Sequence, residues 1–500
     1  MRKLLIPILI ALTALAVFTA CTSRPTNVVD AKVLPAIYPD YVGVTIPTDI
    51  APMNFAMADD AYTCVDVEVR GSRSGSLHVG GSDADFPIDS WRKLLDANRG
   101  GRLTFVVCAR KDGQWLRFRP FHMHVSNTPI GEWGITYRRI APGYVIYGQM
   151  GIYQRQLSTF DEQPLIESSQ SPGMCVNCHT ANRTSPNQYV YHVRGAHGAT
   201  VVHRDGSDEL LQARNDLLGG SMVYPYWHPA GRYCAFSTNH TAQMFHTAHN
   251  KRIEVYDDSS DVFVYDTQHH LILNDTLIMR KAWAENTPAF SPDGRWLYFT
   301  TARRQHYPDD YQQQRYSLCR VAFDAATGRL GNHVDTLVNA RLTGKSATWP
   351  RPSYDGRYVM YTRADYGYFT VWHPESDLWL YDVKSGRTSA LNAANSRCAD
   401  SFHNWALNSR WFLFASRRDD GLYSKVYFSC ITSGGRATKP FLLPQRHPKS
   451  YYQQSLYSFN TPDFVSAPVQ PHPRQMGQLI ERPHRVKTKV RNTSAASNSQ

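Results

Sequence analysis

Hydrophobic and polar residues alternate along short stretches of this chain, and the clearest stretch recurs at long intervals. Residues 288–301 read Pro-Ala-Phe-Ser-Pro-Asp-Gly-Arg-Trp-Leu-Tyr-Phe-Thr-Thr, and related copies occupy 225–238, 349–362 and, in a weaker form, 403–416. Each copy predicts an incoming strand, a tight turn of the Asp-Gly type and an outgoing strand with alternating apolar side chains. The pattern therefore predicts a fold made of repeated antiparallel strands.

Further strands complete the repeats. Segments 261–266, 318–324 and 377–382 each follow one of the copies and end in aspartate. Three or four antiparallel strands per unit, repeated about every 60 residues, are typical of a β-propeller. The sequence thus predicts an all-β fold.

Two weaker blades precede the clear ones. They are expected at 135–157, including a strand at 144–148, and at 189–204, while 461–465 supplies a strand that closes the ring. We therefore predict a six-bladed propeller over residues 127–465.

The motif Pro-x-x-Ser-Pro-Asp-Gly-Arg followed by an apolar strand resembles the repeat of the TolB-like propeller family. The resemblance covers about residues 221–441, and 288–301 is the closest copy. It implies a propeller fold and a protein partner on the propeller face, because TolB-like propellers mostly bind proteins. Relatives with this repeat include peptidases with a separate catalytic domain, and we expect none here because the chain ends soon after the last repeat.

Residues 22–126 carry a different pattern, which predicts a small β-rich domain before the propeller. Residues 89–97 predict one helix, with Asp89 or Ser90 as its N-cap. Strands are expected at 64–70, 103–109 and 115–125. The role of this domain cannot be derived from its residues.

The N-terminal residues 1–21 predict export. Two basic residues precede an apolar run at 4–18, which is shorter than the roughly 20 residues of a membrane span. Residues 18–21 resemble the lipobox of bacterial lipoproteins, which implies cleavage before Cys21 and lipidation of its thiol; a plain secretory signal is the alternative. Residues 22–24 lack the aspartate that commonly retains lipoproteins at the inner membrane, so the resemblance implies a lipid anchor in the outer membrane, facing the periplasm.

Cys175-Val-Asn-Cys178-His179 is the attachment motif of c-type haem. The two thiols can form thioethers with the porphyrin, and His179 is then the proximal iron ligand. A disulfide with an adjacent histidine and half of a zinc site are the alternatives, although no second ligand pair for zinc stands out. We expect the motif in an insertion at about 165–188, between the first two blades.

The second axial ligand of such a haem is open. His192 and His197 follow the motif closely, and we favour His192, with His197 and then Met222 behind it. An open iron face would instead permit ligand binding, and Arg194 with His197 is a weak indication of a peroxidase-like site.

The remaining cysteines suggest little chemistry. Cys64 and Cys108 form the easiest disulfide pair to imagine. The others lie one by one in apolar strand patterns and are expected as buried free thiols: Cys234, Cys319, Cys398 and Cys430.

The formal net charge of +12 is concentrated near the C-terminus. Residues 466–500 are rich in arginine and lysine and lack an apolar period, so we expect a disordered tail. An exported protein meets little nucleic acid, and contact with anionic lipid head groups or no role beyond solubility is the better expectation.

A polar stretch between two predicted strands holds several potential metal ligands without regular spacing. We expect a solvated loop there rather than a metal site. The residues are His240, His246, His249, Asp257, Asp258 and Asp261.

The sequence contains no Gly-x-Ser-x-Gly elbow, phosphate loop or His-Glu-x-x-His, so it indicates a carrier or binding protein rather than an enzyme. The first hypothesis is a cell-envelope lipoprotein that transfers electrons through one covalent haem c. The alternative is a propeller module that binds a protein or glycan, with a structural or sensory haem, or with a disulfide and no haem.

Overall fold

The computed structural model describes residues 24–141, 150–170, 173–212, 220–246, 251, 253–470 and 473–494. These residues form two compact units. The smaller unit comprises 24–130, 157–161 and 438–456, and the larger unit holds the other described residues. The lipidation predicted at Cys21 and the strand predicted at 144–148 lie outside the described residues.

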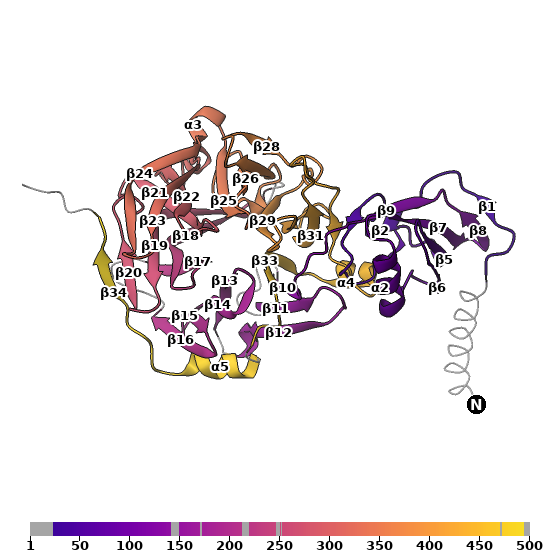
Figure 1. Ribbon diagram of the computed structural model, residues 1–500, viewed down its shortest axis with the longest axis horizontal. Coiled ribbons are helices and arrows are strands. Elements are labelled where there is room, and N and C mark those ends of the chain that lie inside the picture. Colours follow the sequence, from indigo (N-terminus) through magenta and orange to yellow (C-terminus); the bar gives the residue numbers. More distant parts are fainter. Residues whose placement is uncertain are drawn as a thin grey trace, which may run out of the picture. The chain divides into compact units, whose positions relative to one another are not determined.

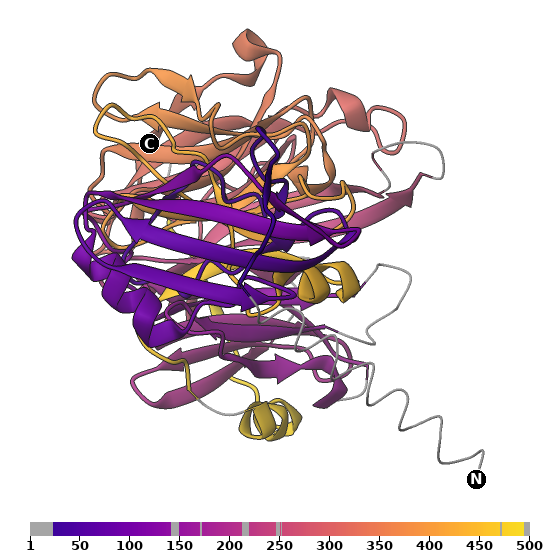
Figure 2. The same ribbon diagram turned by 90° about the vertical axis from the view of Figure 1, so that its right-hand side faces the viewer.

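The smaller unit is a β-sheet with one helix, as predicted. Its main sheet runs in the order β1-β8-β7-β5-β6, with β9 pairing both β7 and β3, and a second sheet pairs β2 with β4. Figure 2 shows its long indigo strands side by side. The strands are β1 (Val29–Asp30), β2 (Ile37–Tyr38), β3 (Thr45–Ile46), β4 (Ala56–Met57), β5 (Tyr62–Gly71), β6 (Ser76–Gly81), β7 (Arg102–Lys111), β8 (Gln114–Arg117) and β9 (Phe121–Val125).

Helix α2 (Ile88–Ala97) buries Trp91, Leu94 and Leu95, which recur at helical spacing. The predicted helix is confirmed, but its predicted cap is wrong. The helix begins at Ile88, one residue before Asp89, so Pro87 is the N-cap. Proline has no polar side-chain atom, and the structure accordingly shows no side-chain cap bond. The same unit includes the short helix α4 (Pro448–Gln454).

The larger unit is a six-bladed β-propeller, and Figure 1 shows its sheets in a ring. From the centre outward, the first three blades are β33 (Ser458–Val465), β10 (Gly134–Ile140), β11 (Met150–Gln156), β12 (Glu162–Glu167); β13 (Cys175–Asn182), β14 (Ser185–Arg194), β15 (Ala199–Arg204), β16 (Ser207–Gln212); and β17 (Ser221–Trp227), β18 (Tyr233–Phe245), β19 (Ile253–Asp266), β20 (Leu271–Asn274). The last three are β21 (Trp283–Phe290), β22 (Trp296–Arg303), β23 (Ser317–Asp324), β24 (Arg329–Val338); β25 (Ser346–Pro352), β26 (Tyr358–Ala364), β27 (Asp377–Asp382), β28 (Thr388–Ala390); and β29 (Asp400–Trp405), β30 (Trp411–Ser416), β31 (Lys425–Cys430). Strand β32 (Phe441–Leu442) belongs to the segment 438–456 of the smaller unit. The predicted fold and blade number are confirmed.

The ring closes between the two ends of the propeller sequence. Strand β33 pairs antiparallel with β10, so the first blade combines a C-terminal strand with three N-terminal ones. The closing strand predicted at 461–465 is therefore confirmed. Phe464 and Val465 of this strand are fully buried, so closure also joins the apolar core.

All six inner strands carry the same irregularity. In each, two residues bulge out of the ladder with the neighbouring strand. Five of the bulges begin at a residue with positive φ: Tyr224, Thr287, Trp349, Phe402 and Thr461. The second bulge residue is Pro225, Pro288, Pro350 or Pro462 in four blades, and Cys178 or His403 in the other two. A bulge re-aims the side chains after it, and here it recurs around the central channel.

The Cys-x-x-Cys-His motif lies on an inner strand, not in an insertion. Residues 175–182 form β13, the innermost strand of the second blade, so the insertion predicted at about 165–188 is wrong. Residues Cys178-His-Thr-Ala-Asn-Arg are the second blade's copy of the repeat that begins at Pro225, Pro288 and Pro350. The resemblance is hidden because the turn after β13 uses Arg183 and Thr184 at positive φ in place of Asp-Gly.

The basic tail is ordered over most of its described length, so the predicted disorder is wrong there. Helix α5 (Pro473–Glu481) buries Met476, Leu479 and Ile480 in the apolar cluster of the first two blades. Strand β34 (Lys489–Asn492) extends the third blade by parallel pairing with β20. Three apolar residues at helical spacing suffice to dock a helix that is otherwise polar.

No helix in the described part of the chain is long and apolar enough to cross a membrane. Cys108 is a buried free thiol, so the predicted Cys64–Cys108 disulfide is wrong. Cys234, Cys319 and Cys430 are buried and free, as expected, while Cys398 is free but only half-buried.

Candidate functional site

The candidate site lies in the central channel, beginning with the Cys-x-x-Cys-His motif on β13. Cys175 and Cys178 are both free thiols, so the disulfide considered for this motif is not present. His179 is 5 % exposed and neither of its ring nitrogens has a hydrogen-bond partner among the described residues. The motif thus presents two free thiols and an imidazole whose ring nitrogens have no partner among the described residues.

Burial sets the protonation of this motif. It lowers the pKa of His179 to about 3, with a smaller opposing effect from the backbone of Thr136. It also raises the pKa of Cys178, against the positive charges of Arg138 and Arg194. At neutral pH the motif therefore holds a neutral imidazole and a protonated thiol.

Arg138 approaches the first thiol of the motif. Its guanidinium lies 4.0 Å from the Cys175 sulfur and 3.7 Å from that of Met150. Arg194 is paired across the ladder with Cys175. Two cations therefore flank the motif.

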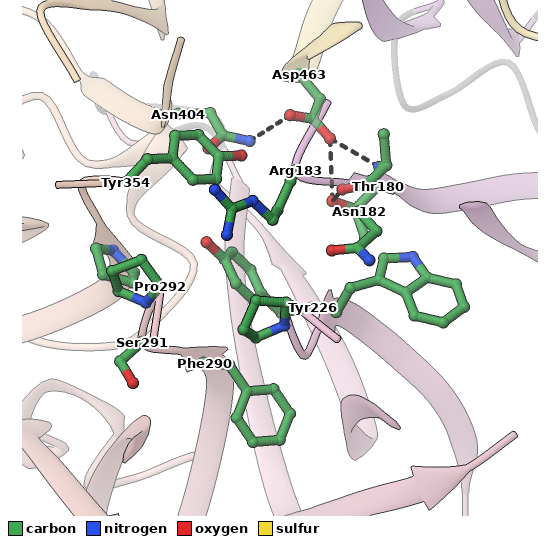
Figure 3. Close-up of a pocket in the computed structure, with 14 residues that line it drawn as sticks. Thr180, Asn182, Arg183, Tyr226, Phe290, Ser291, Pro292, Tyr354, Asn404 and Asp463 are labelled. Carbon is green, nitrogen blue, oxygen red and sulfur yellow. Dashed lines mark hydrogen bonds between the residues drawn. The ribbon is translucent and has the colours of Figure 1, made fainter. Parts of the chain in front are cut away.

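Two small adjoining cavities occupy the channel. One, of about 20 Å³, is shown in Figure 3 and lies among the turns that leave the inner strands. The other, of about 30 Å³, is lined by Cys178, His179 and His403. Thr180, Asn404 and Asp463 line both cavities, so the two are neighbours along one channel.

Asp463 links three blades at this point. Its carboxylate accepts hydrogen bonds from the Thr180 hydroxyl and the Ala181 amide, both at 3.0 Å, and from Asn404 at 2.5 Å. Figure 3 shows these bonds converging on the carboxylate. Burial raises the pKa of Asp463 to about 6 in spite of them. This residue holds the closing strand β33 to β13 and β29.

The channel also contains two arginines beside tyrosine rings. The Arg351 guanidinium lies 5.2 Å from the centre of the Tyr226 ring, and that of Arg183 lies 5.9 Å from the Tyr354 ring. Burial lowers the pKa of Arg351 and raises that of Tyr226 to about 12. Both arginines extend the polar lining of the channel.

The predicted axial ligands do not join His179 in its cavity. His192 is buried on β14, where its Nδ1 contacts the Thr200 hydroxyl at 2.9 Å while Nε2 has no partner. His197 is exposed in the turn after β14, and Met222 is buried in the third blade. His192, His197 and Met222 are all absent from the lining of the cavity that holds His179.

His403 is the residue that the sequence reasoning missed. It is 2 % exposed, neither ring nitrogen has a hydrogen-bond partner among the described residues, and burial lowers its pKa to about 3. The available signal was the repeat alignment, in which Cys178 and His403 replace a proline that four other blades keep.

The donors of β13 fit a c-type haem, because two free thiols stand beside a histidine with unpartnered nitrogens. The space around these donors, however, is too small for the porphyrin ring. A cavity of about 30 Å³ has room for one or two water molecules, and a porphyrin does not fit between the described residues that line it. Residues 142–149, 171–172 and 213–219, which adjoin these strands in the sequence, lie outside the described residues.

The polar histidine and aspartate stretch was expected as a solvated loop, but this expectation is wrong. It forms a long hairpin of β18 and β19. Asp257 is buried there and accepts hydrogen bonds from Thr241, Asn286 and Tyr368. His240 contacts Asp258 at 2.6 Å. No group of three or more metal-ligating side chains occurs among the described residues; His249 lies outside them.

No protein-family model matches the chain, and no curated protein sequence matches it. Solved structures similar to it include prolyl oligopeptidase B from Galerina marginata (12 % identity, 62 % of this chain and 44 % of that chain, TM-score 0.35). Others are Kuenenia stuttgartiensis hydrazine synthase (10 %, 69 % and 50 %, 0.43) and the tricorn protease (13 %, 68 % and 34 %, 0.33). The chain spans about half the length of the first structures it matches.

Proposed function

We propose that this protein is an electron-transfer lipoprotein of the bacterial cell envelope that carries one covalent haem c on its propeller. The observation that supports this function is the β13 donor set, in which Cys175 and Cys178 are free thiols and neither ring nitrogen of His179 has a hydrogen-bond partner among the described residues. The resemblance of the N-terminus to a lipoprotein signal supports an anchor on Cys21, in the outer membrane facing the periplasm. A redox partner would be a protein of the same compartment that docks on a propeller face.

Each residue of the motif has a distinct task in this proposal. The two thiols would hold the porphyrin edge, and His179 would bind the iron, which supplies the one-electron chemistry. The low pKa of His179 keeps its imidazole neutral and ready to bind a metal throughout the physiological range. Arg138 and Arg194 are the nearby cations suited to the propionate carboxylates.

The test is covalent haem attachment in a strain that matures c-type cytochromes. We expect a haem-stained band on a denaturing gel and a c-type pyridine haemochrome spectrum for the wild type. Cys175→Ser with Cys178→Ser should abolish both, whereas Cys234→Ser, a buried thiol in the third blade, should leave both unchanged. Absence of covalent haem in the wild type would refute the proposal.

The second axial position needs its own variants. Low-spin spectra of the wild type would indicate a six-coordinate iron, as electron transfer favours. Separate His192→Ala, His197→Ala and His403→Ala variants would then identify the ligand by a change to high-spin iron. Retention of the low-spin spectrum in all three would exclude these histidines.

A second function, a propeller module that binds a protein or glycan without haem, is favoured by the tight packing around β13. The adjoining cavity of about 30 Å³ is small, and Cys178 takes a position that proline fills in other blades. This function predicts that protein purified from strains with and without haem maturation is fully folded and has the same melting temperature. A large gain in melting temperature on maturation would argue against it.

A further inference from the structure

Two arginines of the channel have no acidic partner. Arg351 donates to the Pro350 carbonyl at 2.9 Å, and Arg183 extends from the turn after β13. Within the ranges that the structure describes, neither forms an ion pair with a carboxylate. Guanidinium groups next to low-dielectric walls attract anions more strongly than they do in open water.

Asp463, the acid in the channel, does not neutralise the charges of Arg351 and Arg183. Asp463 is the only carboxylate among the described residues that line the two cavities. Its oxygens are already engaged by Thr180, Ala181 and Asn404. Arg351 is half-buried and Arg183 is exposed, and together their two guanidiniums outnumber the one carboxylate of the lining, so a monoanion would balance the excess positive charge.

Neutral donors line the first cavity together with Arg183, while Arg351 lines the second cavity next to it. The hydroxyls of Tyr226 and Tyr354 line the first cavity, and the described residues offer neither of them a hydrogen-bond partner. Figure 3 shows the Arg183 guanidinium beside the hydroxyl ends of both rings. Charged and neutral donors that meet in one place are the usual way in which proteins bind an oxyanion.

The size and walls of the channel restrict the anion. Cavities of about 20 and 30 Å³ each have room for one or two water-sized groups, so the two adjoining cavities together admit a group of a few heavy atoms. Phe290, Pro292 and Pro352 provide apolar walls beside the donors. A planar carboxylate on a slender stem fits this space, whereas a sugar or a nucleotide does not.

We propose that the propeller channel binds a carboxylate through Arg351, Arg183 and the hydroxyls of Tyr226 and Tyr354. The carboxylate comes either from a small organic acid or from the C-terminus of a peptide chain. None of its four side chains belongs to the Cys-x-x-Cys-His motif, and Arg351 lines the same cavity as Cys178 and His179.

The test is isothermal titration calorimetry on the full-length protein with three probes. They are acetate, N-acetyl-triglycine with a free carboxylate, and the same peptide as its C-terminal amide. We expect binding of at least one carboxylate and much weaker binding of the amide. Binding of both carboxylates assigns the site to small acids, and binding of the free peptide alone assigns it to chain termini.

Two variants and one control locate the site. Arg351→Gln should weaken carboxylate binding about tenfold or more, since it removes a charge-assisted bond. Tyr354→Phe removes one hydroxyl only and should weaken it about threefold, so it keeps the test valid if Arg351→Gln fails to fold. Arg357→Gln, an exposed arginine on the turn after β25 that stacks on Tyr358, should change nothing. Equal binding of the amide, absence of carboxylate binding, or wild-type affinity in Tyr354→Phe and any folded Arg351→Gln protein would overturn the proposal.

Discussion

Asp463→Asn tests whether the cost of burying the carboxylate or the gain from its hydrogen bonds dominates the contribution of Asp463 to stability, at the point where the ring closes. The carboxylate oxygens accept three hydrogen bonds from β13 and β29. An asparagine keeps one acceptor oxygen for Thr180 and Ala181, but turns an amide group toward the Asn404 amide. Asn404 cannot simply rotate to accept, because its own oxygen already accepts from the Trp405 amide. Where Asp463 is protonated it also keeps only one full acceptor oxygen, so the substitution should cost only about 1 kcal/mol there.

The cost should shrink as the pH rises. Burial raises the pKa of Asp463 to about 6 in the folded protein, against about 3.9 in an unfolded chain. A group with a raised pKa binds its proton more tightly in the folded state, so its contribution is present below about pH 4 and is lost as the pH rises through 6. At 1.36 kcal/mol per pKa unit, the free energy of unfolding of wild type should fall by about 3 kcal/mol relative to the variant, of which about 2 kcal/mol falls between pH 4.5 and 7.5. Near pH 7.5 the variant should therefore equal or exceed wild type.

Urea unfolding followed by tryptophan fluorescence at pH 4.5, 6.0 and 7.5 measures this difference. Asp309→Asn is the control, because the Asp309 side chain is 76 % exposed and, among the described residues, its only ion pair is a loose one with His306. The effect of this substitution should be near zero at every pH. A wild-type advantage over Asp463→Asn that stays constant or grows with pH would refute the reasoning. It would show that the hydrogen bonds from Thr180, Ala181 and Asn404 outweigh the desolvation of the carboxylate.

Three further predictions concern the fold, and thermal melts by circular dichroism check each of them. Gly294→Ala should destabilise by more than about 2 kcal/mol, because a Cβ would lie 2.2 Å from a His228 nitrogen at a positive φ, whereas Gly344→Ala, with positive φ but open space, should cost about 1 kcal/mol. Ile480→Ala in α5 should lower the free energy of unfolding by about 2–5 kcal/mol. Leu342→Ala is the control and should change almost nothing, because Leu342 is 85 % exposed. Equal melting temperatures for the two variants would mean that the helix does not dock. Cys178→Pro should cost less than about 1 kcal/mol, since proline fills this bulge position in four other blades, and an unfolded variant would contradict the equivalence.

The repeat made the propeller predictable, because its turn residues and alternating strands act locally. A tight Asp-Gly turn and an alternating strand can be recognised from their own residues alone. Four blades are predictable from the sequence for this reason. The second blade did not, since its turn uses Arg183 and Thr184 where the others use glycine or serine. The tail was mistaken for disorder because α5 has only three buried side chains, and their partners lie in the first two blades. Such partners are not visible in a local window of sequence.

The candidate site was only half predictable for the same reason. Cys175, Cys178 and His179 form a local motif, but the residues that share their channel come from strands far away in the sequence. Only the ring brings His403, Arg351 and Asp463 to one place. The bulge explains how: it occurs at the same level of every inner strand and turns the following side chain into the channel. Chemistry at that level can therefore change by substitution within the repeat, without any change in the blades. A cysteine and a histidine stand in two blades at the position where the other four carry proline, and those two positions are where function should be sought first.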